Sequence, residues 1–147
     1  MYIAINYKDF NKYFLLFGEK TKNTIIENSL FSNILYSTQT FTMNNIVLHF
    51  KLGDTHIEKY FSKYKCSFNN NNTIIEKLKE IEFNILLKYN EHKKKHYKLA
   101  EQLDKKFFKF FIKNNNYSFK NKEFIIKISG IWETEVNCGI IYKFIKN

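Results

Sequence analysis

The stretch Phe124-Ile-Ile-Lys-Ile-Ser-Gly-Ile-Trp-Glu-Thr-Glu-Val-Asn-Cys-Gly-Ile-Ile-Tyr-Lys-Phe-Ile145 decides the fold, because its pattern predicts two strands folded back on each other. Apolar residues recur at every second position, namely Phe124, Ile126 and Ile128 in the first run and Ile140, Tyr142 and Phe144 in the second. Lys127 and Lys143 fall between them, so one face of the hairpin is expected in the core and the other in solvent. Gly130 and Gly139 bracket the tip, where glycine permits a bulge or a positive φ.

The composition combines many rings with a high positive charge. Aromatic residues make up 18% of the 147 residues, and this length fits a single domain, 1–147, with a core rich in Phe and Tyr. The formal net charge is +10, and all 24 basic residues are lysines. Lysine binds phosphate as a point charge, whereas bidentate recognition of guanine usually requires arginine. The charge therefore favours polyanionic partners without sequence-specific duplex recognition, although an AT-rich genome would give the same composition without a functional cause.

The N-terminal half predicts a series of strands. Rings and branched residues over 1–17 favour one or two strands ending at Gly18, and the polar segment 19–28 favours a loop or a short irregular strand. Strand-like content over 30–41 leads through a turn at Asn44-Asn45 into a buried strand over 46–52, which Gly53-Asp54 ends.

The middle of the chain contains one strong helix signal. Thr73-Ile-Ile-Glu76 is a capping box, and an apolar stripe follows it, so a helix is expected over about 73–90. The stripe consists of Ile74, Leu78, Ile81, Ile85 and Tyr89, widened by Ile75 and Leu86. The preceding segment, 55–68, fits either a short helix or an extended basic arm, and Asn69 to Asn72 predict a loop.

The next elements lead from this helix to the terminal hairpin. Lys93 to Lys95 are expected at a solvated corner, a second short helix over 97–103, a strand over 105–113 and a loop over 114–116. The order of elements predicts an α+β fold: a small, mainly antiparallel OB-like barrel or sheet with one central helix and a C-terminal β-hairpin. A sheet that a helix covers, and that is not closed, is the alternative.

Metal and catalytic signatures are weak. His92 and His96 stand four apart, but no cysteine or carboxylate cluster completes a tetrahedral set, so we expect no metal site and no cofactor. Cys66 and Cys138 lack CxxC spacing and a nucleophile motif, and free structural thiols in a reducing compartment are expected. We therefore expect no catalytic residues.

Two carboxylates flank Thr134 near the hairpin tip. Glu133 and Glu135 could hold a cation weakly, but such a pair is more often a solvated loop, which is the interpretation we favour.

Lysines alternate with rings in two segments, 59–65 and 105–113. Basic grooves whose exposed rings stack on bases hold single-stranded nucleic acid without sequence preference. The residues expected to bind are Lys59, Tyr60, Lys63, Tyr64, Lys105, Lys109 and Trp132. In the alternative, the rings face the core, Phe108 and Phe110 above all, and the lysines only solvate the other side of a strand.

Four runs carry a resemblance to known proteins: Met43-Asn-Asn-Ile-Val-Leu-His-Phe50, Ile57-Glu-Lys-Tyr-Phe-Ser-Lys-Tyr-Lys-Cys66, Ile128-Ser-Gly-Ile-Trp-Glu-Thr-Glu135 and Cys138-Gly-Ile-Ile-Tyr-Lys-Phe-Ile145. They resemble a group of short uncharacterised proteins of large DNA viruses, and the layout is similar to that of viral single-stranded DNA-binding proteins with an OB fold. Those proteins typically end in an acidic tail, whereas this chain ends in Tyr-Lys-Phe-Ile-Lys-Asn. The resemblance implies an intracellular protein of the host cytoplasm or nucleus, in a viral factory or a virion.

The leading functional hypothesis is a non-enzymatic protein that binds single-stranded nucleic acid without sequence preference. The alternative is a structural or virion component that assembles with itself or with other viral proteins through aromatic-rich surfaces. An enzyme is the third hypothesis. No apolar run approaches the roughly 20 residues needed to cross a bilayer, so no membrane partner is expected.

Overall fold

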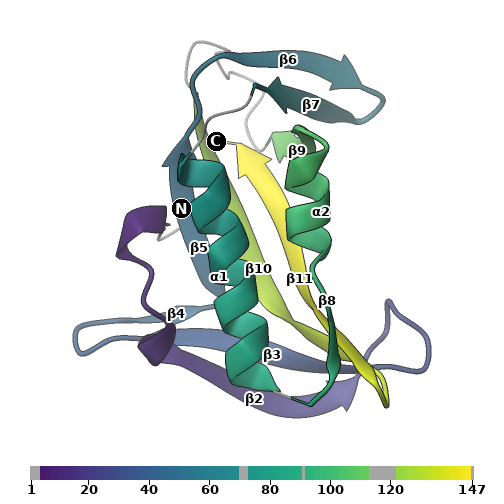
Figure 1. Cartoon of the computed structure of the whole chain (residues 1–147). Coiled ribbons are helices and arrows are strands. Elements are labelled where there is room, and N and C mark those ends of the chain that lie inside the picture. The colour runs from purple at the N-terminus through teal and green to yellow at the C-terminus, as the bar shows by residue number, and fades with distance from the viewer. Residues whose placement is uncertain (1–3, 70–72, 91, 113–121, 147) are drawn as a thin grey trace.

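The computed structural model describes residues 4–69, 73–90, 92–112 and 122–146, and Figure 1 shows how the elements are arranged. Two α-helices, α1 (Thr73–Tyr89) and α2 (Lys98–Asp104), lie on one face of a mixed sheet. The expected α+β fold with a central helix over about 73–90 is confirmed, and so is the second short helix. The predicted loops at 70–72 and 114–116 lie outside the described residues.

Within the described ranges of the chain the sheet contains eleven strands. In chain order they are β1 (Ile5–Asn6), β2 (Leu15–Lys22), β3 (Leu30–Ser37), β4 (Thr42–Asn44), β5 (Ile46–Lys51), β6 (Thr55–Tyr60), β7 (Lys63–Phe68), β8 (Lys94–His96), β9 (Phe107–Ile112), β10 (Glu123–Glu133) and β11 (Asn137–Lys146). The buried strand predicted over 46–52 and the ring-rich strand predicted over 105–113 correspond to β5 and β9.

The C-terminal hairpin predicted from the sequence forms as β10 and β11, and it lies in the middle of the main path of the sheet. β10 pairs with β11 along its length, while its first half also pairs with β5 and its second half with β3. The change of partner occurs at a register shift between Ile128 and Gly130. A Cβ at Gly130 would lie 2.2 Å from the ring of Phe31, so glycine is required by this close approach, and none of the described glycines has a positive φ.

The main path of the sheet runs β1-β5-β10-β11-β9-β7-β6, with β11 parallel to both β8 and β9. In the described part of the chain this sheet is not closed into a barrel, and β1 and β6 stand at its two ends. The open sheet with a covering helix, rather than a closed barrel, is therefore the architecture.

The core lies between the helices and the sheet. The stripe of α1 is buried as predicted, with Leu78, Ile81 and Ile85 almost fully removed from solvent. Beneath it five phenylalanines from four strands have contacting rings: Phe50, Phe108, Phe110, Phe124 and Phe144. The rings of Phe108 and Phe144 stack with centroids 4.2 Å apart. The core interpretation of Phe108 and Phe110 is thereby confirmed.

The segment 55–68 is not a helix. It forms the β6–β7 hairpin, which projects at the top of Figure 1. β7 pairs with β9, and alternation along β7 buries Cys66 and Phe68, so the period of two prevails over the helical spacing of the rings. The extended alternative was right.

The N-terminal segment is less regular than predicted. The side chain of Asn6 accepts a hydrogen bond from the backbone N–H of Lys8, and that of Asn11 accepts one from the backbone N–H of Tyr13. Each asparagine begins a 3-10 turn, Tyr7–Asp9 and Lys12–Phe14 respectively, in the middle of the expected strand. Gly18 does not end β2, because pairing with β3 continues beyond a register shift between Phe17 and Lys20.

Candidate nucleic-acid interface

The face of the sheet opposite the helices is basic. Since Phe108 and Phe110 of β9 point into the core, their neighbours Phe107, Lys109 and Phe111 lie on the other face. The same alternation places residues of the other central strands there. We call this the helix-free face.

Four lysines form a row across four adjacent strands of the helix-free face. Lys127 of β10 is the register partner of Lys143 of β11, and Lys109 of β9 is the partner of Lys65 of β7. Because Phe144 is the partner of Phe110, Lys143 and Lys109 are neighbours as well. The ion pairs among the described residues involve other lysines, and the carboxylate beside this lysine row is that of Glu58, the register partner of Lys65.

Rings accompany the lysines on this face. Three ammonium groups lie over aromatic rings: Lys63 at 4.8 Å from the centroid of Phe111, Lys65 at 4.5 Å from that of Phe107, and Lys109 at 4.1 Å from that of Tyr60. Such contacts hold a lysine in place through the ring quadrupole and leave its charge available. Tyr60 and Phe111 stay 41% and 47% exposed.

A groove of about 450 Å³ opens between β9 and β11. The two strands share register only from Phe110 to Ile112, so their preceding residues diverge. Four lysines line the groove, together with the rings of Phe107 and Phe111: Lys63, Lys105, Lys109 and Lys143. No carboxylate is among the described residues that line it. We call it the lysine groove, and the positive charges of its four lysines favour an anionic ligand.

The structure brings together four of the seven residues predicted to bind. Lys63, Lys105 and Lys109 line the lysine groove, and Tyr60 contacts Lys109. Lys59 and Tyr64 are register partners on the opposite side of the β6–β7 hairpin, where the ring of Tyr64 stacks on that of Phe110.

Trp132 lies elsewhere, beside the tip of the β10–β11 hairpin. Its indole packs against Gly139, where an added Cβ would lie 2.6 Å from the ring nitrogen, and against His96 with ring centroids 5.6 Å apart. The imidazole ring of His96 is in turn held by a 2.9 Å hydrogen bond between its Nε2 and Asn137 Oδ1. Trp132 is therefore a packing residue that joins β10 to β8.

Five further residues of the candidate interface were not named individually from the sequence: Lys65, Phe107 and Phe111, which lie within the two segments of alternating lysines and rings, and Lys127 and Lys143. The alternation of the hairpin already placed Lys127 and Lys143 on the side away from the core. Alternation does not show which strand lies beside the hairpin. Only the parallel pairing of β9 with β11 places Lys143 next to Lys109.

Glu133 is not a solvated loop residue, which corrects that prediction. Its side chain is 1% exposed, Lys20 Nζ lies 2.9 Å from Oε1, Tyr89 donates a 2.8 Å hydrogen bond to it, and Lys93 binds Oε2. Burial raises the pKa of Glu133, but the hydrogen bonds from Lys93, Lys20 and Tyr89 outweigh burial and lower it to about 2. Glu135 is exposed.

The prediction that Lys93 to Lys95 lie at a solvated corner is also corrected. Lys93 is held by the buried carboxylate of Glu133, and Lys94–His96 forms β8, parallel to the start of β11. Lys94 alone among the three lysines is exposed.

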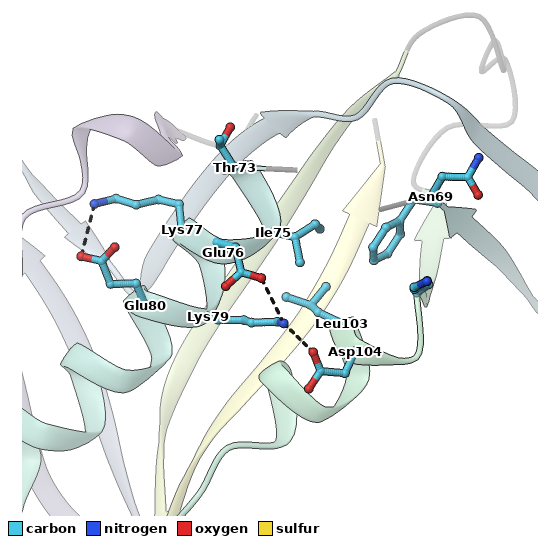
Figure 2. A pocket seen from close by; sticks show the side chains of 11 residues that line it. Asn69, Thr73, Ile75, Glu76, Lys77, Lys79, Glu80, Leu103 and Asp104 are labelled. Atoms are coloured by element: carbon cyan, nitrogen blue, oxygen red, sulfur yellow. Dashed lines mark hydrogen bonds and ion pairs between the residues drawn. The ribbon is translucent and has the colours of Figure 1, made fainter. Parts of the chain in front are cut away.

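A larger cavity, of about 910 Å³, lies between the start of α1, the end of α2 and the end of β7 (Figure 2). Lys79 bridges Glu76 and Asp104 there, so the glutamate of the predicted capping box is engaged by a lysine. The lining contains as many carboxylates as ammonium groups: Glu76, Glu80 and Asp104 against Lys77, Lys79 and Lys106. The charges offset each other, and this cavity has no preference for an anion.

The cysteines do not form a reactive centre. Cys66 and Cys138 are both free and buried, as expected of structural thiols. Burial raises the pKa of Cys66 to about 12 and raises that of Cys138 as well, so both stay protonated at neutral pH. Within the described residues no three His, Cys, Asp or Glu side chains are grouped so as to hold a metal ion.

None of the described helices is both long and apolar enough to cross a membrane. Comparison of the chain with models of protein families, with curated proteins and with solved structures gives no match.

Proposed function

We propose that this protein binds single-stranded nucleic acid, without sequence preference, on the helix-free face of its sheet. The observation that carries the proposal is the lysine groove, in which four lysines converge without a carboxylate among the described lining residues. The lysine row continues the same charge across β10, β11, β9 and β7.

The chemistry of these residues suits a phosphate chain. Each ammonium group that contacts a phosphate releases a condensed counterion, which favours binding at low salt. Lysine does not form the bidentate contacts by which arginine recognises guanine, so the bound sequence matters little. The exposed rings of Tyr60 and Phe111 supply stacking surfaces beside the charges.

The setting we propose is that of the resemblance, an intracellular protein of a large DNA virus, acting as one domain. The OB-like part of the proposal rests on the layout: strands precede α1, and a hairpin follows it and completes the sheet. OB folds likewise bind single strands on a sheet face.

The first prediction concerns the lysine groove. Replacing Lys63, Lys105, Lys109 and Lys143 by Gln should make the logarithmic salt dependence of affinity for a labelled single-stranded oligonucleotide shallower by about 2.8, at about 0.7 per lysine. The melting temperature should fall by a few degrees at most, since substitutions of exposed or partly exposed surface residues each alter the free energy of unfolding by about 0.5 kcal/mol or less. Fluorescence anisotropy over a salt series measures the slope.

A matched control removes the same charge elsewhere. Lys8, Lys59, Lys94 and Lys98 are exposed and do not line the groove. Their quadruple Gln variant should keep most of the slope. An equal loss in the two variants would mean that net charge alone attracts the oligonucleotide, and the proposed site would be wrong.

The second candidate function is assembly through exposed rings. It is favoured by Phe61, Phe111 and Tyr60, which remain exposed near one edge of the sheet. If the parent protein fails to bind oligonucleotide at low salt but sediments as an oligomer, which Phe111→Ala dissociates, this candidate replaces the first.

A further inference from the structure

The tip of the β6–β7 hairpin displays a ring in an unusual backbone conformation. Phe61 is 85% exposed, and its φ is 55°. Bulky residues rarely adopt this left-handed region, which Asn, Asp and Gly tolerate best. Elsewhere in the described chain such positions are occupied by Asn28, Asn45, Asp54 and Lys106. The two-residue turn between Tyr60 and Lys63 accounts for the positive φ, but it does not account for a phenyl ring, which is disfavoured in this conformation and buries almost nothing here.

This ring is continuous with the lysine groove. Phe61 contacts Tyr60 edge to face, with centroids 4.9 Å apart and planes at 89°. Tyr60 in turn lies under Lys109, and its register partner Lys63 lines the groove. The exposed aromatic tip and the phosphate-attracting lysines are therefore parts of one surface, and the hairpin projects clear of the helices (Figure 1).

We propose that Tyr60 and Phe61 form a base-stacking site, in which an unstacked nucleobase packs on the ring of Phe61 while its flanking phosphates contact Lys63 and Lys109. This inference rests on the proposed function and deepens it by naming what selects single strands. The bases of a duplex are already stacked on each other, so only a strand with unstacked bases can occupy the site. The ligand class is a single strand of DNA or RNA, because both carry the same faces and phosphates.

The test uses Phe61→Asn in the full chain. Asn suits the positive φ, so the variant should melt at the same temperature as the parent or higher. Its affinity for a labelled single-stranded oligonucleotide should fall by about 5- to 150-fold, the range expected for one lost stack. The parent and Phe61→Asn should bind a blunt duplex of the same sequence with equal affinity, weaker than that of the parent for the single strand. Val136→Asn is the control, because Val136 is 63% exposed at the other hairpin and should leave both affinities unaltered.

A strand with abasic sites separates stacking from charge. The parent should bind this strand less tightly than the intact one by at least the same factor, while Phe61→Asn should show a smaller preference for the intact strand, because only the rings of Tyr60 and Phe111 remain to stack on its bases. Equal affinity of the parent for the two strands, or an unchanged affinity in Phe61→Asn, overturns the stacking site. If the quadruple Gln variant still loses binding in that case, the lysine groove stands and only the stacking site falls. If the parent binds no strand at low salt, both proposals fall together. An oligoribonucleotide of the same sequence tests whether DNA and RNA are treated alike.

Discussion

At the scale of single residues, Glu133 combines almost complete burial with a retained charge. An isolated carboxylate in that position would be strongly destabilising, but Lys20, Lys93 and Tyr89 surround it with donors. Tyr89 also shares a 3.0 Å hydrogen bond with Ser32, so the network joins the end of α1 to β3 and β10. One charge therefore holds three elements together at the end of the central hairpin.

This network predicts a pH dependence of stability. Because the pKa of Glu133 falls from 4.5 to about 2 on folding, its contribution is complete above the ordinary pKa and is lost as pH falls from 4.5 towards 2. The shift corresponds to roughly 3 kcal/mol. Melting curves between neutral pH and about pH 2 should show this loss in the parent, and Glu133→Gln should be less stable at neutral pH with a flatter acid profile.

The neighbouring Glu135→Gln serves as the control for that experiment, because Glu135 is exposed at the same tip. It should follow the profile of the parent. Identical acid profiles in all three proteins would show that Glu133 gains nothing from its partners.

At the scale of elements, the two helices are joined by another buried carboxylate. Glu82 of α1 is fully buried and accepts 2.9 Å hydrogen bonds from the N–H groups of Leu99 and Ala100 in the first turn of α2. It caps a neighbouring helix rather than its own. Burial raises the pKa of Glu82, and the hydrogen bonds from Ala100 and Leu99 oppose that rise.

Removing this cap should loosen α2. Glu82→Ala leaves the buried N–H group of Leu99 and the partly buried N–H group of Ala100 without an acceptor, which costs roughly 2–4 kcal/mol. Urea unfolding measures the change in free energy. Glu80→Ala, two residues away on the exposed side of α1, should cost less than about 0.5 kcal/mol. Equal losses in the two variants would contradict the capping role.

The sequence could predict the elements whose signal is local. α1 has its own apolar stripe and β10–β11 its own alternation, and both were located closely. The β6–β7 hairpin and β8 were not, because their conformation depends on pairing with β9 and β11, which lie far away in the sequence. The same holds for the candidate site. Lys109 could be identified from the rings beside it in the sequence, but the position of Lys143 next to it follows from the strand order. The burial of Glu82 and Glu133 could not be predicted, because nothing local marks a carboxylate whose hydrogen-bond donors come from other elements.

At the scale of the whole molecule, one face of the sheet contributes the apolar core and the other carries lysines. One face packs a cluster of phenylalanines under α1 and α2, and the other carries the lysine row and the lysine groove. Alternation along a strand is what makes this division possible, since neighbouring residues serve opposite faces. Part of the net charge of +10 is thereby concentrated on a surface that no helix covers.

The last prediction tests this division with two phenylalanines of β9. Phe108 is fully buried and stacks on Phe144, so Phe108→Ala should lower the free energy of unfolding by about 3–5 kcal/mol. Phe111 is 47% exposed beneath the ammonium group of Lys63, so Phe111→Ala should cost far less stability and should weaken oligonucleotide binding several-fold. Chemical unfolding and anisotropy measured on both variants separate the two effects. A Phe111→Ala variant as unstable as Phe108→Ala would place that ring in the core, and an unaltered affinity would remove it from the binding surface.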